Sequence, residues 1–187
     1  MERRLAAGEA AVAPLTRLGT PLMTGIAPMP YSELLRMFEA GSASGNRYAL
    51  GTHWLPELTD ETITALAEGA ATRSSPTSLL ALHQFHGAAS RVAPDATAFA
   101  LRRDHLLAEV IAAWPPGEAD GPHVEWIKTT TTALAPGAIP GGYPNILGPE
   151  DSDRIRLGFA GNVDRLLAAK HRYDPDATFA AIAALTA

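Results

Sequence analysis

The chain has 187 residues, of which 47% are hydrophobic and 19% are charged, and its formal net charge at pH 7 is −5. This apolar content excludes a mainly disordered chain, and the acidic balance argues against nucleic acid or an anionic membrane as the main partner. Because the chain contains no cysteine, disulfides, thiolate metal ligands and thiol nucleophiles are excluded.

The sequence shows neither a membrane span nor a secretory signal. No apolar run reaches the roughly 18 residues that a spanning helix needs. Basic residues follow Met1, but Gly8, Glu9 and Pro14 interrupt any apolar segment after them. The sequence therefore predicts a cytoplasmic protein without a membrane partner.

The first half of the chain alternates predicted helices with extended segments. Between 47 and 55, apolar and polar residues alternate, which places Tyr48 and Trp54 on one face of a strand. Thr59 fits the N-cap of the helix that follows. In chain order, the predicted elements are a helix at 8–18, an extended run at 21–27, a helix at 31–40 with Ser32 as N-cap, a strand at 47–55, a helix from Asp60 to about Thr72, and a strand at 78–86.

The second half predicts two strands followed by helices. The strands lie near 97–102 and at 106–114, followed by a helix at 123–135, a loop at 136–142, a long amphipathic helix at 151–172 and a final apolar helix from Ala177. Two pairs of strands have short connections, which favours antiparallel pairing. The sequence therefore predicts an α+β fold: a mainly antiparallel sheet with helices on one face, followed by a C-terminal helical segment.

Glu109 is the one charged residue in an otherwise apolar strand. On a strand, Leu107 and Ile111 would flank it on the same face. Burying a carboxylate without a partner is costly, and enzymes use such positions for general bases. Alternatively, this face meets solvent, or Glu109 pairs with an arginine such as Arg102. The residues alone leave both interpretations open.

Other candidate motifs do not predict a cofactor site by themselves. His83 and His86 lie three positions apart on a predicted strand, so they would point to opposite faces and not share a metal ion. Gly141-Gly142 lacks the remainder of a phosphate-binding loop, and no dinucleotide-binding fingerprint is present. We therefore predict no metal site.

The C-terminal stretch carries a series of short motifs. They are Gly142-Tyr143-Pro144-Asn145, Phe159-Ala160-Gly161-Asn162, Arg165-Leu166, Lys170, Tyr173-Asp174-Pro175 and Phe179. In order and spacing they resemble the terminal pattern of the berberine-bridge-enzyme-like family of FAD-linked oxidases. Upstream segments resemble the substrate domain of that family: Pro28–Tyr31, Thr52–Leu58, Gly87–Arg91 and Thr97–Phe99 with Arg102.

The resemblance covers nearly the whole chain but only the C-terminal part of such an enzyme. It implies a truncated substrate-domain-like region at 1–140 and a C-terminal segment at 141–187. The FAD-binding domain of the family has no counterpart here. We therefore expect oxidoreductase-like chemistry but not an autonomous oxidase, with FAD present only if a partner domain or chain supplies it. We also expect a homo- or hetero-oligomer, because a surface left uncovered by that domain would be apolar.

The resemblance also implies roles for three residues. Tyr143 and Asn145 match a Tyr-x-Asn motif that lies beside the flavin in the family. Glu109 falls on a strand from which family members point polar residues at the substrate. The position after the motif, often a catalytic tyrosine, is Ile146, which transfers no proton.

Two functions follow from this resemblance. The first is the substrate-domain part of an FAD-linked oxidoreductase acting on a small molecule, with Glu109 as base or as the group that orients the substrate, and with Tyr143 and Asn145 facing the flavin. The alternative is a flavin-free descendant, either a small-molecule-binding protein or a cyclase or isomerase that uses Glu109. A decayed fragment without activity is a third possibility.

Overall fold

The computed structural model describes residues 2–20, 28–37 and 45–179. The chain forms two compact units, Met1–Ala43 and Ser44–Ala187. In the first unit, α1 spans Glu2–Val12, a short 3-10 turn spans Leu15–Arg17, and α2 spans Tyr31–Arg36. No helix in the described part of the chain is long and apolar enough to cross a membrane.

Two predictions for this first unit differ from the structure. The helix predicted at 8–18 begins earlier and ends at Val12, because Pro14 lacks an N–H and clashes with a continuing helix. The second helix has Pro30 at its N-cap instead of Ser32, and no side chain caps it. The extended run at 21–27 and the end of the predicted 31–40 helix fall outside the described residues.

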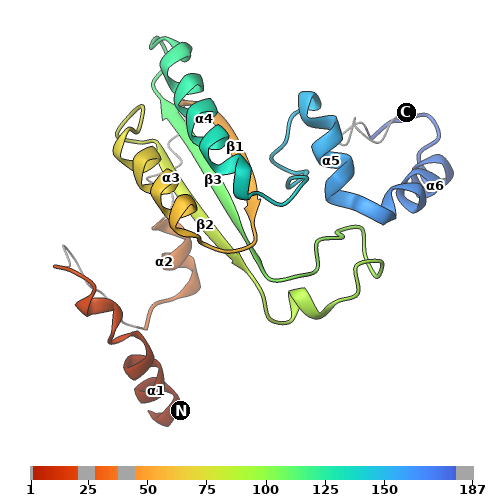
Figure 1. Cartoon of the computed structure of the whole chain (residues 1–187). Coiled ribbons are helices and arrows are strands. Elements are labelled where there is room, and N and C mark those ends of the chain that lie inside the picture. Colours follow the sequence, from red (N-terminus) through yellow and green to blue (C-terminus); the bar gives the residue numbers. More distant parts are fainter. Residues whose placement is uncertain (1, 21–27, 38–44, 180–187) are drawn as a thin grey trace. The chain divides into compact units, whose positions relative to one another are not determined.

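The second unit is built on a three-stranded sheet. Strands β1 (Arg47–Leu55), β2 (Leu79–Phe85) and β3 (His105–Trp114) lie in the order β1-β3-β2, and β3 pairs antiparallel with both neighbours (Figure 1). Helix α3 (Asp60–Ala71) connects β1 to β2, and α4 (Asp120–Leu134) follows β3. The predicted α+β class with an antiparallel sheet is confirmed.

Helices α3 and α4 lie side by side and contact the strands (Figure 1). Thr59 caps α3 as predicted, since its side chain accepts a hydrogen bond from the backbone N–H of Thr62. The core lies between these helices and one face of the sheet, and consists of Leu55, Ala65, Ala108, Val110, Ala112, Trp114, Trp126, Ile127 and Leu134. Helix α4 packs closely on β1 at Gly51, because a Cβ added to this glycine would lie 2.6 Å from the Thr131 side chain.

The strand predicted near 97–102 does not form. Instead, the segment between β2 and β3 is largely irregular, with one short 3-10 turn at Ala89–Arg91. In this segment, side chains donate hydrogen bonds to backbone carbonyls that in a sheet would accept hydrogen bonds from a neighbouring strand. Arg102 donates to the carbonyls of Phe99 and Ala89, and Asn162 donates to three carbonyls of the segment 94–98.

The long helix predicted at 151–172 is broken into two. Helix α5 (Ser152–Phe159) ends where Ala160 adopts a φ of 43°, a 3-10 turn spans Ala160–Asn162, and α6 (Val163–Tyr173) follows. The break turns the Asn162 side chain into the protein, where it reaches the carbonyls named above. The final helix predicted from Ala177 is not helical at 177–179, and its remainder lies outside the described residues.

Candidate functional site

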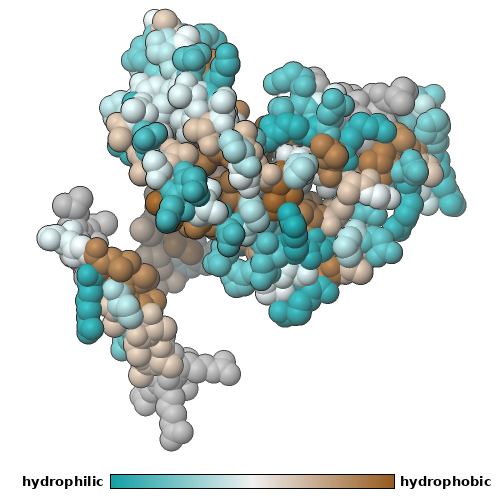
Figure 2. Space-filling model, in the orientation of Figure 1, coloured by the Kyte–Doolittle hydropathy of each residue, from teal (hydrophilic) through white to brown (hydrophobic). Residues whose placement is uncertain are grey.

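The second face of the sheet is not covered by α3 and α4. Strand register places Glu109 at the centre of this face, directly between Thr52 of β1 and Ala81 of β2. Leu107 and Ile111 flank Glu109 along β3, as predicted, and both are partly buried. Figure 2 shows the exposed surface of α3 and α4 as mainly hydrophilic, whereas hydrophobic residues gather between these helices and the C-terminal helices.

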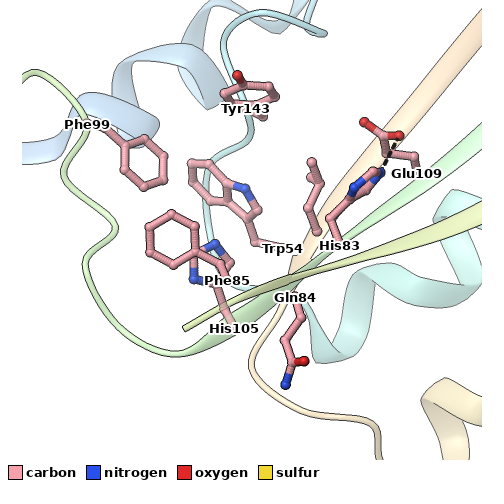
Figure 3. Close-up of a pocket in the computed structure, with 9 residues that line it drawn as sticks. Trp54, His83, Gln84, Phe85, Phe99, His105, Glu109 and Tyr143 are labelled. Atoms are coloured by element: carbon pink, nitrogen blue, oxygen red, sulfur yellow. Dashed lines mark hydrogen bonds and ion pairs between the residues drawn. The ribbon is translucent and has the colours of Figure 1, made fainter. Parts of the chain in front are cut away.

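A cavity of about 510 Å³ opens on this face (Figure 3). This volume lies in the range of about 300–1,000 Å³ that is typical of small-molecule sites. All three strands, the irregular segment before β3 and the loop after α4 contribute to it. The lining residues are Trp54, His83, Gln84, Phe85, Phe99, His105, Leu107, Glu109 and Tyr143. The cavity therefore combines one carboxylate with a largely aromatic wall.

Glu109 is paired with a histidine on the neighbouring strand. Nε2 of His83 lies 3.0 Å from Oε2 of Glu109. The Glu109 side chain is 13% exposed, whereas that of His83 is 60% exposed. The suggested pairing with Arg102 is wrong, because Arg102 binds the carbonyls of Phe99 and Ala89 and the Thr97 hydroxyl. Glu109 is thus a mostly buried carboxylate whose one paired oxygen contacts an exposed histidine side chain.

Aromatic rings form one end of the cavity. Trp54 meets Phe99 edge to face at a centroid distance of 5.9 Å, and Phe85 stacks on His105 at 4.6 Å (Figure 3). Nδ1 of the buried His105 lies 2.7 Å from the carbonyl oxygen of Arg103. Since a carbonyl only accepts, Nδ1 carries the proton. Burial lowers the pKa of His105, so the ring is neutral near pH 7.

Acid is therefore expected to destabilise the folded chain through His105. The folded-state pKa of His105 lies below its ordinary value of 6.5, so on acidification the unfolded chain binds a proton that the folded chain does not. The contribution of His105 to the free energy of unfolding should be fully present above pH 6.5, its ordinary pKa, and should decrease as the pH falls below 6.5. Urea unfolding at about pH 7.5 and about pH 5 should show a smaller decline for His105→Phe than for the parent chain. An equal decline in both would contradict this, and the exposed His86→Gln serves as control.

The structure brings Tyr143, but not Asn145, to the cavity that contains Glu109. Tyr143 lines the cavity, and the exposed Asn145 donates from Nδ2 to its hydroxyl over 2.9 Å. Ile146 lines a separate cavity beside His53 and Arg154. Asn145 therefore holds the Tyr143 ring from outside the cavity.

Tyr143 presents an aromatic ring to the cavity, whereas Gly141 and Gly142 do not form an open cradle for a pyrophosphate. The Tyr143 ring offers an aromatic contact on the same cavity as Glu109. A pyrophosphate needs open backbone N–H groups, yet Gly141 and Gly142 are closely packed. A Cβ on Gly141 would lie 3.0 Å from the Trp54 ring, and one on Gly142 would lie 2.5 Å from the Leu147 side chain. Among the described residues, no group of three or more His, Asp or Glu is placed to hold a metal ion.

His83 and His105 are site residues that sequence reasoning missed. His83 was considered only as half of a metal pair with His86. The signal that could have found both is the two-residue alternation of the strands. It places His83 and Phe85 on one face of β2, and His105, Leu107 and Glu109 on the same face of β3.

Comparison with known proteins supports the predicted resemblance. No family model matches the chain. A curated protein of Bacillus subtilis strain 168, named as the uncharacterized FAD-linked oxidoreductase YgaK, is 28% identical over 169 residues, covering 89% of this chain and 37% of that protein. The resemblance to FAD-linked oxidases is confirmed. The chain thus spans little more than a third of this curated relative.

Solved structures show the same fold. Berberine bridge enzyme from Eschscholzia californica matches with a TM-score of 0.62 and 22% identity, over 70% of this chain and 31% of that enzyme. GilR, an oxidoreductase solved with pregilvocarcin, matches with a TM-score of 0.58 and 22% identity over the same shares. At 22% sequence identity this likeness establishes the fold alone. The matched part of the chain corresponds to less than a third of the length of each enzyme.

Proposed function

We propose that this chain is the substrate-binding part of an FAD-linked oxidoreductase that acts on a small molecule, with FAD supplied by a separate domain or chain. One observation carries the proposal: Glu109 and Tyr143, from distant parts of the sequence, line one cavity on the open face of the sheet. The FAD-linked relative and the berberine-bridge-type fold support the class of chemistry.

In this proposal, Glu109 accepts a proton from the substrate, and the aromatic wall orients the substrate against the sheet. Low exposure excludes most water around the carboxylate and strengthens its hydrogen bonds. A bound flavin would supply hydride acceptance, and Tyr143, held by Asn145, would contact its ring. Ile146 takes no part, because it lines another cavity.

The alternative function is a flavin-free binding protein, cyclase or isomerase that uses the same cavity. The close packing of Gly141 and Gly142 is compatible with both functions, because in the first one the pyrophosphate would be bound by the separate flavin-bearing part. Both functions require Glu109 and the aromatic wall. They differ in whether Tyr143 meets a flavin.

Binding of flavins by the purified chain separates the two functions. If Tyr143 contacts only the ring, the chain should bind riboflavin and FAD equally and weakly, with dissociation constants no tighter than about 100 μM, and remain colourless after desalting. Flavin fluorescence titration measures this, and Tyr143→Ala should weaken both. The exposed Tyr173→Ala is a matched control.

Other results would change the assignment. Stoichiometric FAD that survives desalting would refute the need for a separate flavin-bearing part. Absence of any Tyr143-dependent ring binding would favour the flavin-free alternative. Light scattering on the same sample tests the proposed oligomer, for which a defined dimer or larger assembly is expected.

A further inference from the structure

A second cavity, of about 450 Å³, lies at the outer edge of β1. Helix α4 forms one of its walls, and the loop that leads into α5 forms another. It shares no lining residue with the Glu109 cavity, and its volume also lies in the range of about 300–1,000 Å³ that is typical of small-molecule sites. Neither function proposed above uses this cavity.

Four charged side chains line the second cavity, two of each sign. Arg154 and Asp151 are paired with each other, because Nη1 of Arg154 lies 3.1 Å from Oδ1 of Asp151. Nη2 of Arg154 also donates to the backbone carbonyl of Thr52. The remaining two, Lys128 on α4 and Glu150 on the loop, have no ion pair or hydrogen bond with the described residues. One cation and one anion therefore line different walls of the cavity without a partner.

The loop keeps the Glu150 carboxylate beside the cavity. A Cβ added to Gly148 would collide with both carboxylate oxygens of Glu150. The side chain therefore folds back over this glycine instead of extending away from the loop, and Gly148 also lines the cavity.

His53 adds an uncharged polar group to the same cavity. Burial, and then the charge of Arg154, lower the pKa of His53, so its ring is neutral near pH 7. A neutral imidazole has one nitrogen that accepts a hydrogen bond, and it adds no positive charge to that of Lys128.

Two apolar side chains in the cavity are unusually exposed. Leu50 of β1 is 46% exposed and Val124 of α4 is 50% exposed, and both line the cavity. An apolar group bound there would cover surface that now meets water, which favours binding.

The charge pattern selects the class of ligand. A simple anion would be attracted by Lys128 but repelled by Glu150, and a simple cation would meet the reverse, whereas a zwitterion satisfies both. We propose that this cavity binds a free α-amino acid with an apolar side chain, whose carboxylate is bound by Lys128 and whose ammonium group is bound by Glu150. Its side chain lies against Leu50 and Val124. The inference goes beyond the proposed function and depends on neither Glu109 nor a flavin.

Three matched probes test this assignment. L-Leucine carries both charges, 4-methylpentanoate has the same carbon skeleton without the ammonium group, and 3-methylbutylamine lacks the carboxylate. Two-dimensional NMR titration of the full chain gives the dissociation constants and locates binding. Leucine should bind with a dissociation constant of about 1 mM or tighter, shifting the signals of Lys128 and Leu147 but not those of Phe85 and Phe99. Each probe with one charge should bind about three- to fivefold more weakly, because exposed charge pairs contribute that much. Glycine, which lacks the apolar side chain, should also bind at least about threefold more weakly.

Two variants assign the preferences to the two charges. Lys128→Met should remove the preference for leucine over 3-methylbutylamine and keep that over 4-methylpentanoate. Glu150→Gln should do the opposite. Both residues are exposed, so the far-ultraviolet circular dichroism of the variants should match that of the parent chain. Glu68→Gln on α3 and Arg73→Met, also at exposed positions, are the matched controls and should leave all the dissociation constants unchanged.

Several outcomes would overturn the proposal. Leucine that binds more weakly than about 5 mM, or that shifts only signals of the Glu109 cavity, would refute this site. Equal binding of leucine and either probe with one charge would refute a zwitterionic ligand, and equal binding of glycine would refute the apolar contact. A folded Lys128→Met or Glu150→Gln variant with both preferences intact would refute the role of that residue. Leucine binding without riboflavin binding would remove only the flavin-linked function, and the reverse pattern would remove this inference alone.

Discussion

Replacing Leu55 with alanine is expected to lower the free energy of unfolding by about 2–5 kcal/mol. Leu55 has no exposed surface, and it lies at the end of β1 in the core between the sheet and its covering helices. The close packing of α4 on β1 at Gly51 limits how far the helix can collapse into the resulting space. Urea unfolding followed by far-ultraviolet circular dichroism measures the change.

Leu50 on the same strand provides the matched control. It lies on the open face and is 46% exposed, so Leu50→Ala should change stability by no more than about 0.5 kcal/mol in the isolated chain. Equal effects of the two substitutions would contradict the assignment of a one-sided core. A large effect at Leu50 alone would mean that another surface covers the open face in solution.

Replacing Asn162 with aspartate is expected to cost about 3–5 kcal/mol. Asn162 is 4% exposed, and its Nδ2 donates to the carbonyls of Pro94, Thr97 and Ala98. Aspartate has almost the same shape, but its oxygens would face these three carbonyls without a proton to share. The segment that carries Phe99 would then lose these hydrogen bonds to the C-terminal helices, while Arg165 on α6 still donates to the carbonyl of Asp95.

Two measurements test this attachment. Urea unfolding should show the loss of stability, and limited proteolysis should show faster cleavage within 91–104 than in the parent chain. Asn145→Asp, at an exposed position, should change neither by more than a small amount, about 0.5 kcal/mol in stability. Unchanged proteolysis of the Asn162 variant would show that other contacts hold the segment.

The sequence predicts the sheet and its face assignments well, because alternation is a local property. The strands at 47–55, 78–86 and 106–114 each lie within one residue of the observed bounds. The false strand near 97–102 arose because its residues resemble a strand locally. Its backbone carbonyls are taken by Arg102 and Asn162, and the latter lies 60 or more positions away in the chain. No local pattern carries that information.

The site was predictable only in part for the same reason. Glu109 was identified because a single charged residue in an apolar strand can be recognised from the sequence alone. Its partner His83 depends on strand order, which the sequence did not establish, and so Arg102 was considered instead. The helix break at Ala160 was missed because alanine normally continues a helix, whereas here it adopts a positive φ.

The two faces of β3 place opposite demands on one short segment. Val110 and Ala112 belong to the core, while Leu107 and Glu109 line the cavity on the other face. If the N-terminal end of β3 keeps its register, a deletion of one residue between 105 and 108 would exchange the two sets beyond it, directing the carboxylate into the core and the valine into the cavity. Folding and ligand recognition would then fail together. Substitutions can change the cavity one residue at a time, whereas a deletion that shifts the register of this strand changes the cavity and the core together.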